Sequence, residues 1–253
     1  MEHLLVTDEG PVTRITLNRP ERRNALSLPL MEELTKALLA VAGDVVVLAG
    51  AGPVFSAGHD LTELATCDTA KATEVFGACT ALMQTVQSIG QPVIAEVNGV
   101  ATAAGCQLVA ACDLAVAEEG ARFATPGVRI GLFCSTPMVP LSRAIGPKRA
   151  MKMLLTGDLV DARTALDWGL VNDVVPASEL SATVDALARR IAEASPAVIA
   201  VGKRTFWQQL GLDQAAAYDV AAHTMVANAT IPDAREGIGA FLEKRAPTWE
   251  GRS

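Results

Sequence analysis

Two turns built largely from small residues could place backbone N–H groups side by side. The first, residues 55–61, reads Phe-Ser-Ala-Gly-His-Asp-Leu, and the second, residues 98–107, contains Ala-Ala-Gly at positions 103–105. Glycine and alanine let a ligand approach the backbone closely. Two N–H groups that converge on one oxygen atom form an oxyanion hole, and each donor stabilises the transition state by about 2.7–4 kcal/mol. Taken alone, each turn is more often an ordinary tight connection between a strand and a helix.

The segments before both turns are predicted to be strands of one sheet. Residues 45–48 are short, continuous and rich in β-branched residues, which is typical of a strand covered on both faces. Residues 93–97 follow a Gly-Gln-Pro turn, and further strands are predicted at 12–17 and 114–117. Helices are predicted after Ser27, as its N-cap, and at 103–111. This alternation indicates an α/β fold with a mainly parallel sheet.

The pattern becomes helical in the C-terminal part of the chain. Ser178 is predicted to cap a helix, and further helices are predicted at 196–210, 213–228 and 232–244. These helices lack a second apolar layer of their own, so we do not expect a separate domain. We expect them to pack on the sheet core or on another subunit.

The amino-acid composition restricts the class of protein and the kinds of partner that can be expected. With 253 residues, of which 50% are hydrophobic, the chain can bury the core of one large α/β domain, and disorder is excluded. The net charge of −7 argues against a nucleic-acid partner, and small molecules or proteins fit better. No apolar run approaches the ~20 residues that a membrane span needs.

Cysteine usage and the start of the chain predict a compartment. The five cysteines are odd in number and contain no Cys-x-x-Cys pair, so neither a disulfide framework nor a metal site is expected. Reduced thiols fit a reducing compartment. The first residues carry acid where a targeting peptide would carry Lys or Arg. We therefore expect a cytoplasmic protein.

Both turns and a series of shorter motifs resemble the crotonase (enoyl-CoA hydratase/isomerase) superfamily. The resemblance is carried, in family order and spacing, by the two turns, Cys112-Asp113, residues 122–126, 131–133, 155–157 and 168–170. It extends over nearly the whole chain, from Asn18 to Arg245. The stretches Gly-His-Asp-Leu and Gly-Leu-Phe-Cys-Ser-Thr-Pro are similar to the branch called enoyl-CoA hydratase domain-containing proteins.

The resemblance implies a fold, an assembly and a ligand. The expected fold is a ββα spiral with a helical C-terminal trimerisation region, in which residues 1–195 form the core and residues 196–253 an assembly region of the same structural domain. The expected assembly is a homotrimer or a dimer of trimers. The expected substrate is an acyl-CoA of lipid metabolism. No tightly bound cofactor is implied, because coenzyme A arrives as part of the substrate.

The resemblance also assigns site residues. The backbone N–H groups of His59 and Ala104 would hold the thioester oxygen as it gains enolate charge. Arg22 and Arg23 would lie near the CoA phosphates, although a solvated surface charge is the alternative for each basic residue. The remaining expected CoA contacts are Ala57, Gly58, Asp60, Leu61, Gly105 and, often from a neighbouring subunit, Phe241 and Lys244.

The sequence departs from typical hydratases at two positions. Where these use two glutamates to activate water, the chain has Gln107 and Gly127. Glutamine does not accept a proton at neutral pH and glycine has no side chain, whereas each positioned acid–base group contributes about 10²–10⁴-fold. Family isomerases place their single glutamate at the Gly127 position. We therefore expect ordinary hydration of crotonyl-CoA to be slow.

Two functions remain open. The first is an enzyme that stabilises a thioester enolate, and the alternative is a non-catalytic acyl-CoA-binding or assembly protein. Loops around residues 62–80 and 128–140 are expected to line the acyl pocket, and Cys134, Ser135 and Thr136 are expected to face the acyl chain. Cys134 is a candidate weak nucleophile or proton donor, or else a buried inert thiol. The His59 side chain is a candidate base or donor, or else a partly exposed turn residue.

Overall fold

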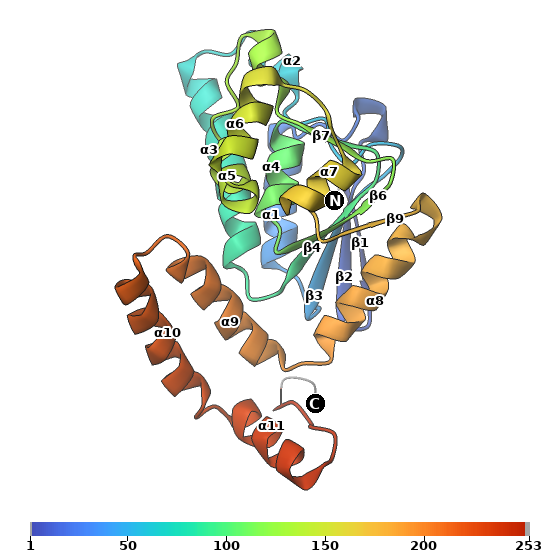
Figure 1. Cartoon of the computed structure of the whole chain (residues 1–253). Coiled ribbons are helices and arrows are strands. Elements are labelled where there is room, and N and C mark those ends of the chain that lie inside the picture. Colours follow the sequence, from blue (N-terminus) through green and yellow to red (C-terminus); the bar gives the residue numbers. More distant parts are fainter. Residues whose placement is uncertain (1, 251–253) are drawn as a thin grey trace.

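The computed structural model describes residues 2–250 as a sheet flanked by helices, with a helical extension (Figure 1). The main sheet has the order β1-β2-β3-β4-β6-β9, and only β1 is antiparallel to its neighbour. Its strands are β1 (Leu4–Glu9), β2 (Val12–Leu17), β3 (Val45–Gly50), β4 (Val93–Val97), β6 (Leu114–Glu118) and β9 (Asp173–Val175). The parallel sheet predicted from the sequence is therefore confirmed, whereas β1 and β9 were not predicted.

A second, smaller sheet lies where the two turns meet. It contains β5 (Val100–Thr102), β7 (Arg122–Ala124) and β8 (Val160–Asp161) in the order β5-β7-β8. Isolated bridges join Val54 to Gly99 and Ser56 to Ala101, so the first turn continues this sheet. Successive chain segments thus give one strand to each sheet before a helix follows, as in β4, β5 and α4 (Ala104–Ala111). This repeat is the ββα arrangement expected from the sequence.

Helices cover both faces of the main sheet. One face packs against α1 (Leu28–Leu39), α3 (Thr69–Ser88) and α4, and the other against α8 (Leu180–Ala192). The residues of β3 from Val45 to Leu48 are completely buried, which explains their uninterrupted apolar run. Ser27 caps α1 as predicted, since its Oγ accepts the Leu30 N–H at 3.4 Å.

Two sequence-based expectations are corrected here. Ser178 does not cap α8, because it lies within the 3-10 helix Ala177–Glu179 and the helix begins at Leu180 with Glu179 at its N-cap. Residues 62–80 were expected to form a loop beside the ligand. They lie mainly in α2 (Leu61–Leu64) and α3 instead, where Asp60 and Asp68 cap the two helices.

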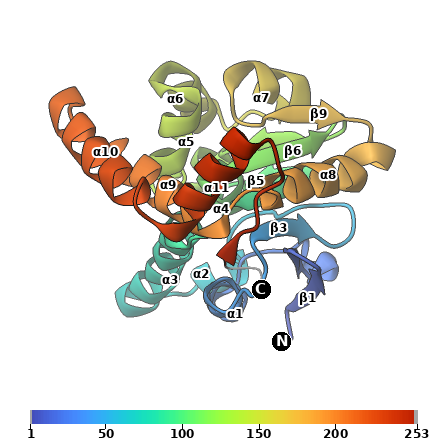
Figure 2. The same ribbon diagram turned by 90° about the horizontal axis from the view of Figure 1, so that it is seen from below.

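The remaining helices lie on two sides of the molecule. The first group comprises α5 (Met138–Ile145), α6 (Pro147–Thr156) and α7 (Ala162–Trp168), and the second α9 (Pro196–Gln209), α10 (Gln214–Asn228) and α11 (Pro232–Glu243). Figures 1 and 2 show α10 projecting away from the body of the chain. Its large side chains Tyr218, Met225 and Val226 are 69%, 63% and 71% exposed. Such apolar exposure is unusual for an isolated chain.

A buried ion pair anchors this helical extension to the core. Lys203 on α9 lies 2.7 Å from an Asp113 carboxylate oxygen, and its ammonium group also donates to the Val86 and Gln91 carbonyls at 2.8 and 2.7 Å. The other Asp113 oxygen accepts the Trp207 indole N–H at 2.9 Å. These bonds fix the start of the extension against the end of α3 and the start of β6.

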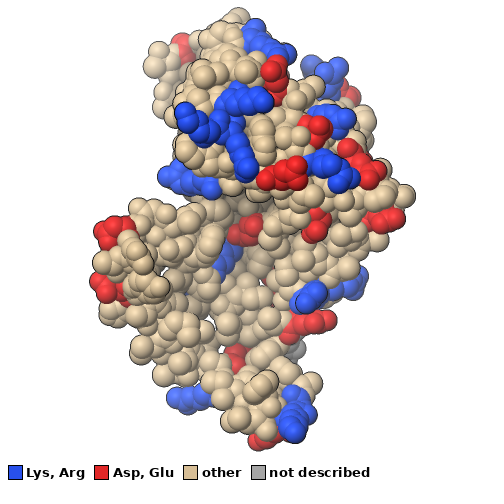
Figure 3. All heavy atoms as spheres, in the orientation of Figure 1, with Lys and Arg blue, Asp and Glu red and all other residues tan. Residues whose placement is uncertain are grey.

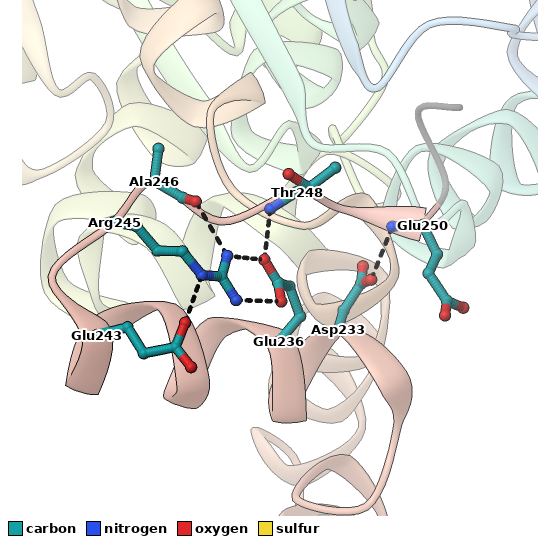
Figure 4. A network of polar contacts seen from close by, with 7 residues as sticks. All are labelled: Asp233, Glu236, Glu243, Arg245, Ala246, Thr248 and Glu250. Atoms are coloured by element: carbon teal, nitrogen blue, oxygen red, sulfur yellow. Dashed lines mark hydrogen bonds and ion pairs between the residues drawn. The ribbon is translucent and has the colours of Figure 1, made fainter.

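The segment after α11 folds back onto that helix (Figure 4). Arg245 bonds both Glu236 oxygens at 2.6 and 2.9 Å, and the Thr248 N–H donates to Glu236 at 2.8 Å. These bonds, first of all those from Arg245, lower the pKa of Glu236 to about 2. Asp233 accepts the Glu250 N–H at 3.0 Å. The end of the described chain is therefore held by polar contacts.

Charge is unevenly spread despite the net value of −7. Figure 3 shows lysine and arginine gathered over α5 and α6 on one face, where these helices carry Arg143, Lys148, Arg149 and Lys152.

Within residues 2–250, no helix combines the length and the apolar character that a membrane crossing requires. The five cysteines are free thiols, and all except Cys67 are buried.

Candidate functional site

A large apolar cavity, called the main cavity below, lies where the two turns meet the segment after β7. Its volume is about 670 Å³. No aspartate or glutamate is found among the described residues that line it, which are Ala57, His59, Leu61, Leu64, Phe76, Ala103, Ala104, Pro126, Gly127, Arg129, Ile130, Leu132, Phe133, Cys134, Ser135, Thr136 and Pro137. The cavity therefore suits an apolar group that meets a few neutral polar atoms.

The two turns are in direct contact because of their glycines. Gly58 has a φ of +93°, and a Cβ built on it would lie 2.7 Å from the Ala103 Cβ and 3.1 Å from the Ala104 nitrogen. A Cβ on Gly105 would lie 2.4 Å from the Ser56 carbonyl oxygen. Only glycine permits this approach of the two backbones. The close packing brings the predicted pair, His59 and Ala104, to the same wall of the main cavity.

The Ala104 N–H is free of helical hydrogen bonding. Ala104 is the first residue of α4, and the first N–H groups of a helix have no acceptor within it. The residue before it, Ala103, has φ 50° and ψ −118°, a conformation normally reserved for glycine. The Ala103 N–H donates to the Ala124 carbonyl at 2.9 Å, which helps to hold this strained turn. The arrangement fixes the direction of the Ala104 N–H before any ligand arrives.

Ala103→Gly is expected to raise the free energy of unfolding by about 1 kcal/mol. Relief of the backbone strain stabilises the folded chain by about 1–3 kcal/mol. The greater conformational freedom of glycine stabilises the unfolded chain by about 0.4–1 kcal/mol and so offsets part of this gain. Ala110→Gly in the same helix is the matched control, and it should destabilise by about 1 kcal/mol because its conformation is helical. Chemical denaturation measures both, and equal destabilisation by the two variants would show that Ala103 is unstrained.

The His59 ring forms part of the cavity wall. It packs edge-on against Phe76 of α3, with ring centroids 5.2 Å apart and an interplanar angle of 77°. Burial lowers the pKa of His59 to about 4, so the imidazole is neutral at pH 7. Its Nε2 is buried and has no hydrogen-bond partner among residues 2–250.

Gln107 and Gly127, at the two positions where hydratases carry glutamate, do not face one cavity together. Gln107 is 3% exposed, and its Oε1 lies 3.7 Å from the Cys79 thiol, which donates to it. Its side chain lines a separate, second cavity of about 330 Å³, whereas Gly127 lines the main cavity. Thr136 borders both.

Cys134 occupies the space that a side chain at position 127 would need. A Cβ on Gly127 would lie 2.8 Å from the Cys134 Sγ and 2.7 Å from the Leu132 carbonyl oxygen. Cys134 is 8% exposed, and burial raises the pKa of its thiol, so it is protonated at neutral pH. The local backbone therefore excludes even a methyl group where a glutamate would be attached.

Gly127→Ala is expected to lower the free energy of unfolding by about 1–3 kcal/mol, the usual cost of forcing a methyl group into a filled space. Adding Cys134→Ala should recover only part of the loss, because the clash with the Leu132 carbonyl remains. Gly77→Ala is the matched control, since a Cβ there meets nothing within 4 Å. It should stabilise α3 by about 0.5–1 kcal/mol. If thermal denaturation shows that Gly127→Ala is harmless, the packing described here is wrong.

The predicted CoA-binding residues of the first turn lie together beside basic residues. Asp60 caps α2 and lies 3.5 Å from Arg19. The Thr62 hydroxyl, which donates to Asp60 at 2.6 Å, and the charges of Arg19 and Arg22 lower the Asp60 pKa. The Arg23 carbonyl accepts the Ala57 N–H at 3.0 Å. The segment that carries both predicted arginines is thus fastened to the first turn.

Phe241 and Lys244 are not brought to this site within one chain. They lie at the end of α11, which Figure 1 shows at the opposite end of the molecule from α2. The Phe241 side chain is 82% exposed. Within a single chain the structure therefore unites the first turn, the second turn and the two arginines, and leaves α11 apart.

Sequence reasoning missed several residues of the site. Arg19, which pairs with Asp60, was not singled out, although its position next to Pro20 places it near the other arginines. Phe76 was not singled out, because a helical aromatic residue gives no signal of the side chain it will meet. Residues 128–140 were expected to line the acyl pocket only as a stretch, and the structure places Ile130, Leu132 and Phe133 of that stretch on the cavity wall, with their side chains 43–56% exposed.

Comparisons with known proteins indicate the same family over nearly the whole chain. The chain matches the family model described as Enoyl-CoA hydratase/isomerase over residues 7–252. Enoyl-CoA hydratase domain-containing protein 3, mitochondrial, of Xenopus laevis is 47% identical over 97% of this chain and 85% of its own length. The crystal structure of the human enoyl coenzyme A hydratase domain-containing protein 3 matches with a TM-score of 0.95 and 44% identity, covering 98% of this chain and 100% of that chain. The 2,3-dehydroadipyl-CoA hydratase of Escherichia coli is 36% identical over 100% of both chains.

The expected cytoplasmic location is contradicted by these relatives. The proteins named enoyl-CoA hydratase domain-containing protein 3 from Xenopus laevis and Rattus norvegicus, 47% and 46% identical to this chain, are both named mitochondrial. Thiol content describes the folded domain, and the same domain can occupy different compartments. The prediction from these features is therefore corrected.

Proposed function

Because the chain belongs to the enoyl-CoA hydratase/isomerase family, we propose that it is an enzyme that binds an acyl-CoA thioester in the main cavity and stabilises its enolate. The backbone N–H groups of His59 and Ala104 would donate to the thioester oxygen. The observation that carries this proposal is the contact between the two turns, in which the Ala104 nitrogen lies 3.1 Å from a Cβ built on Gly58. Both residues line the same cavity.

The chemistry assigned to this pair needs no side chain. When the carbon next to a thioester loses a proton to a base supplied by the substrate or the solvent, or loses a group that departs without its bonding electrons, negative charge develops on the carbonyl oxygen. Two fixed N–H donors in a site with little water stabilise that charge more than they stabilise the neutral substrate. The rigid turn around Ala103 supports this assignment, because donors that are already oriented do not have to reorganise during the reaction.

The acyl chain would lie against the apolar side of the main cavity. Leu64, Phe76 and Ile130 lie on this wall, together with Cys134. We propose Cys134 as a neutral wall group, since its buried thiol is protonated at neutral pH. Undiminished turnover of the true substrate by Cys134→Ser and Cys134→Ala would support this role, and loss of turnover in both would point to a chemical one.

The CoA moiety is proposed to lie over the first turn, where Ala57, Gly58 and Leu61 would support its adenosine part. Gly105 would keep the second turn close. Arg22 and Arg23 would meet phosphate groups, as local cations can in an acidic protein. Phe241 and Lys244 would contribute from a neighbouring subunit. Coenzyme A would enter only as part of the substrate.

The C-terminal region is proposed to assemble subunits into a homotrimer or a dimer of trimers. Residues 196–253 would serve this purpose as part of the same structural domain as residues 1–195. The exposed apolar side chains of α10 and α11 support the proposal, with Val226 71%, Phe241 82% and Leu242 73% exposed. An interface between copies would remove this surface from water.

Ordinary hydratase activity is not part of the proposal, because the residues described along the main cavity include no carboxylate to activate water. We expect the purified protein to hydrate crotonyl-CoA at least about 10²-fold more slowly than an ordinary hydratase. The control is a glutamate-containing hydratase assayed under the same conditions. Equal rates would contradict the role given to the missing glutamates.

The absence of a carboxylate from the described lining also favours the alternative, a non-catalytic acyl-CoA-binding protein. Calorimetry with CoA and a panel of acyl-CoAs, followed by mass analysis of the same mixtures, separates the two functions. Tight binding without any product across diverse thioesters would favour the binding protein. A product that disappears when the Ala104 N–H is removed would favour the enzyme.

A further inference from the structure

The proposed function uses the backbone of His59 and leaves its side chain without a role. The sequence contains three histidines, and the other two have hydrogen-bond partners. His3 lies 2.9 Å from Glu33, and the His223 Nδ1 lies 2.6 Å from the Asp219 carbonyl oxygen. Neither ring nitrogen of His59 has such a partner among residues 2–250, although the residue is partly buried.

Burial without a hydrogen-bond partner is unfavourable for Nε2. A polar atom removed from water without a new hydrogen bond costs free energy, and the apolar Phe76 edge offers no acceptor or donor to compensate. The burial also keeps the ring neutral at pH 7, since it lowers the pKa of His59 to about 4. A neutral imidazole has one N–H donor and one acceptor nitrogen.

One of the two nitrogens is accessible to a ligand. The ring lines the main cavity. Of its two nitrogens, Nε2 is buried without a partner, whereas Nδ1 is not among the buried unpartnered atoms. Because Nδ1 also has no hydrogen-bond partner, it is the nitrogen with accessible surface. The same residue supplies one of the proposed thioester donors through its backbone. A ligand atom that meets the ring therefore lies close along the acyl chain to the thioester carbon.

We propose that the His59 imidazole is a specificity-determining group that hydrogen-bonds a polar substituent on the acyl chain. The substituent is a hydroxyl or keto oxygen near the thioester, and the preferred substrates are hydroxyacyl or oxoacyl thioesters rather than plain alkyl ones. A hydroxyl group suits either tautomer of the ring, because it both donates and accepts. This inference rests on the proposed binding of acyl-CoA in the main cavity.

Paired ligands test the proposal. Calorimetry would compare butyryl-CoA, 3-hydroxybutyryl-CoA and acetoacetyl-CoA on the wild-type chain and on His59→Phe, which keeps the backbone N–H and a ring of similar size. We expect the wild type to bind at least one of the two oxygenated thioesters about tenfold more tightly than butyryl-CoA, the range of one net hydrogen bond. In His59→Phe the ratio of the affinities for the oxygenated thioesters and for butyryl-CoA should fall to about one, whatever the absolute affinity for butyryl-CoA. His59→Gln, which retains a donor and an acceptor, should restore part of it.

The matched control is His223→Phe, which makes the same change in α10, away from the main cavity, and should leave every affinity unchanged. Equal wild-type affinity for all three thioesters, or an unchanged preference in His59→Phe, would overturn the role of the ring and leave the proposed function standing. If no thioester binds, the proposed function fails and this inference falls with it. Thermal denaturation of each variant confirms that loss of preference does not reflect unfolding.

Discussion

Lys203→Met is expected to lower the free energy of unfolding by about 3–5 kcal/mol, the cost of removing one partner of a buried ion pair. Its side chain is 6% exposed and that of Asp113 17%, and the two lie 2.7 Å apart. The substitution leaves the Asp113 charge without its cation and removes donors from the Val86 and Gln91 carbonyls. Urea denaturation measures the effect, and the slope of the unfolding free energy against urea concentration should stay unchanged.

Two further variants make this result specific. Lys203→Met combined with Asp113→Asn should cost less than the sum of the single changes, because no uncompensated charge remains. Lys71→Met breaks the exposed pair with Glu74 at 2.8 Å and should leave the free energy of unfolding unchanged within error. A loss in Lys203→Met no larger than in Lys71→Met would show that the pair does not anchor α9.

Removal of the Ala104 N–H is expected to reduce turnover, or affinity for an enolate analogue, by about 10²–10³-fold. Replacement of Ala104 by lactic acid exchanges this N–H for an oxygen and changes little else. Ala104→Pro is the simpler version, and proline is tolerated at the first residue of a helix. Steady-state kinetics or calorimetry with the true ligand measures the loss.

The control is the same replacement by lactic acid at Ala103. The Ala103 N–H already donates to the Ala124 carbonyl at 2.9 Å, so its loss should reduce stability and leave binding nearly intact. Equal losses of affinity at the two positions would mean that the turn as a whole, and not one N–H group, supports the ligand.

Much of the fold could be predicted from the sequence because local patterns are strong in the sheet core. The buried run of β3 and the Ser27 cap of α1 were both found where expected, and the structural neighbours confirm the predicted crotonase-like α/β fold. The error at Ser178 has a local cause. Serine also favours short 3-10 turns, and only the packing of α8 on the sheet decides where that helix begins.

The site was predictable only in part. The glycines of the two turns indicated close approach of the backbones, and the structure brings these turns together. The separation of Gln107 from the main cavity and the neutral state of His59 had no signal in the sequence. Both residues contact α3, which supplies Cys79 beside Gln107 and Phe76 beside His59, and no local pattern around either residue indicates that packing.

A crystal structure of the protein with bound butyryl-CoA tests the central claim most directly, since that claim concerns the position of a single oxygen atom. The account predicts that the thioester oxygen lies within about 2.7–3.1 Å of the backbone nitrogens of both His59 and Ala104, with the acyl chain in the main cavity. A thioester bound elsewhere, or one whose oxygen lies beyond about 3.5 Å from both nitrogens, would contradict it.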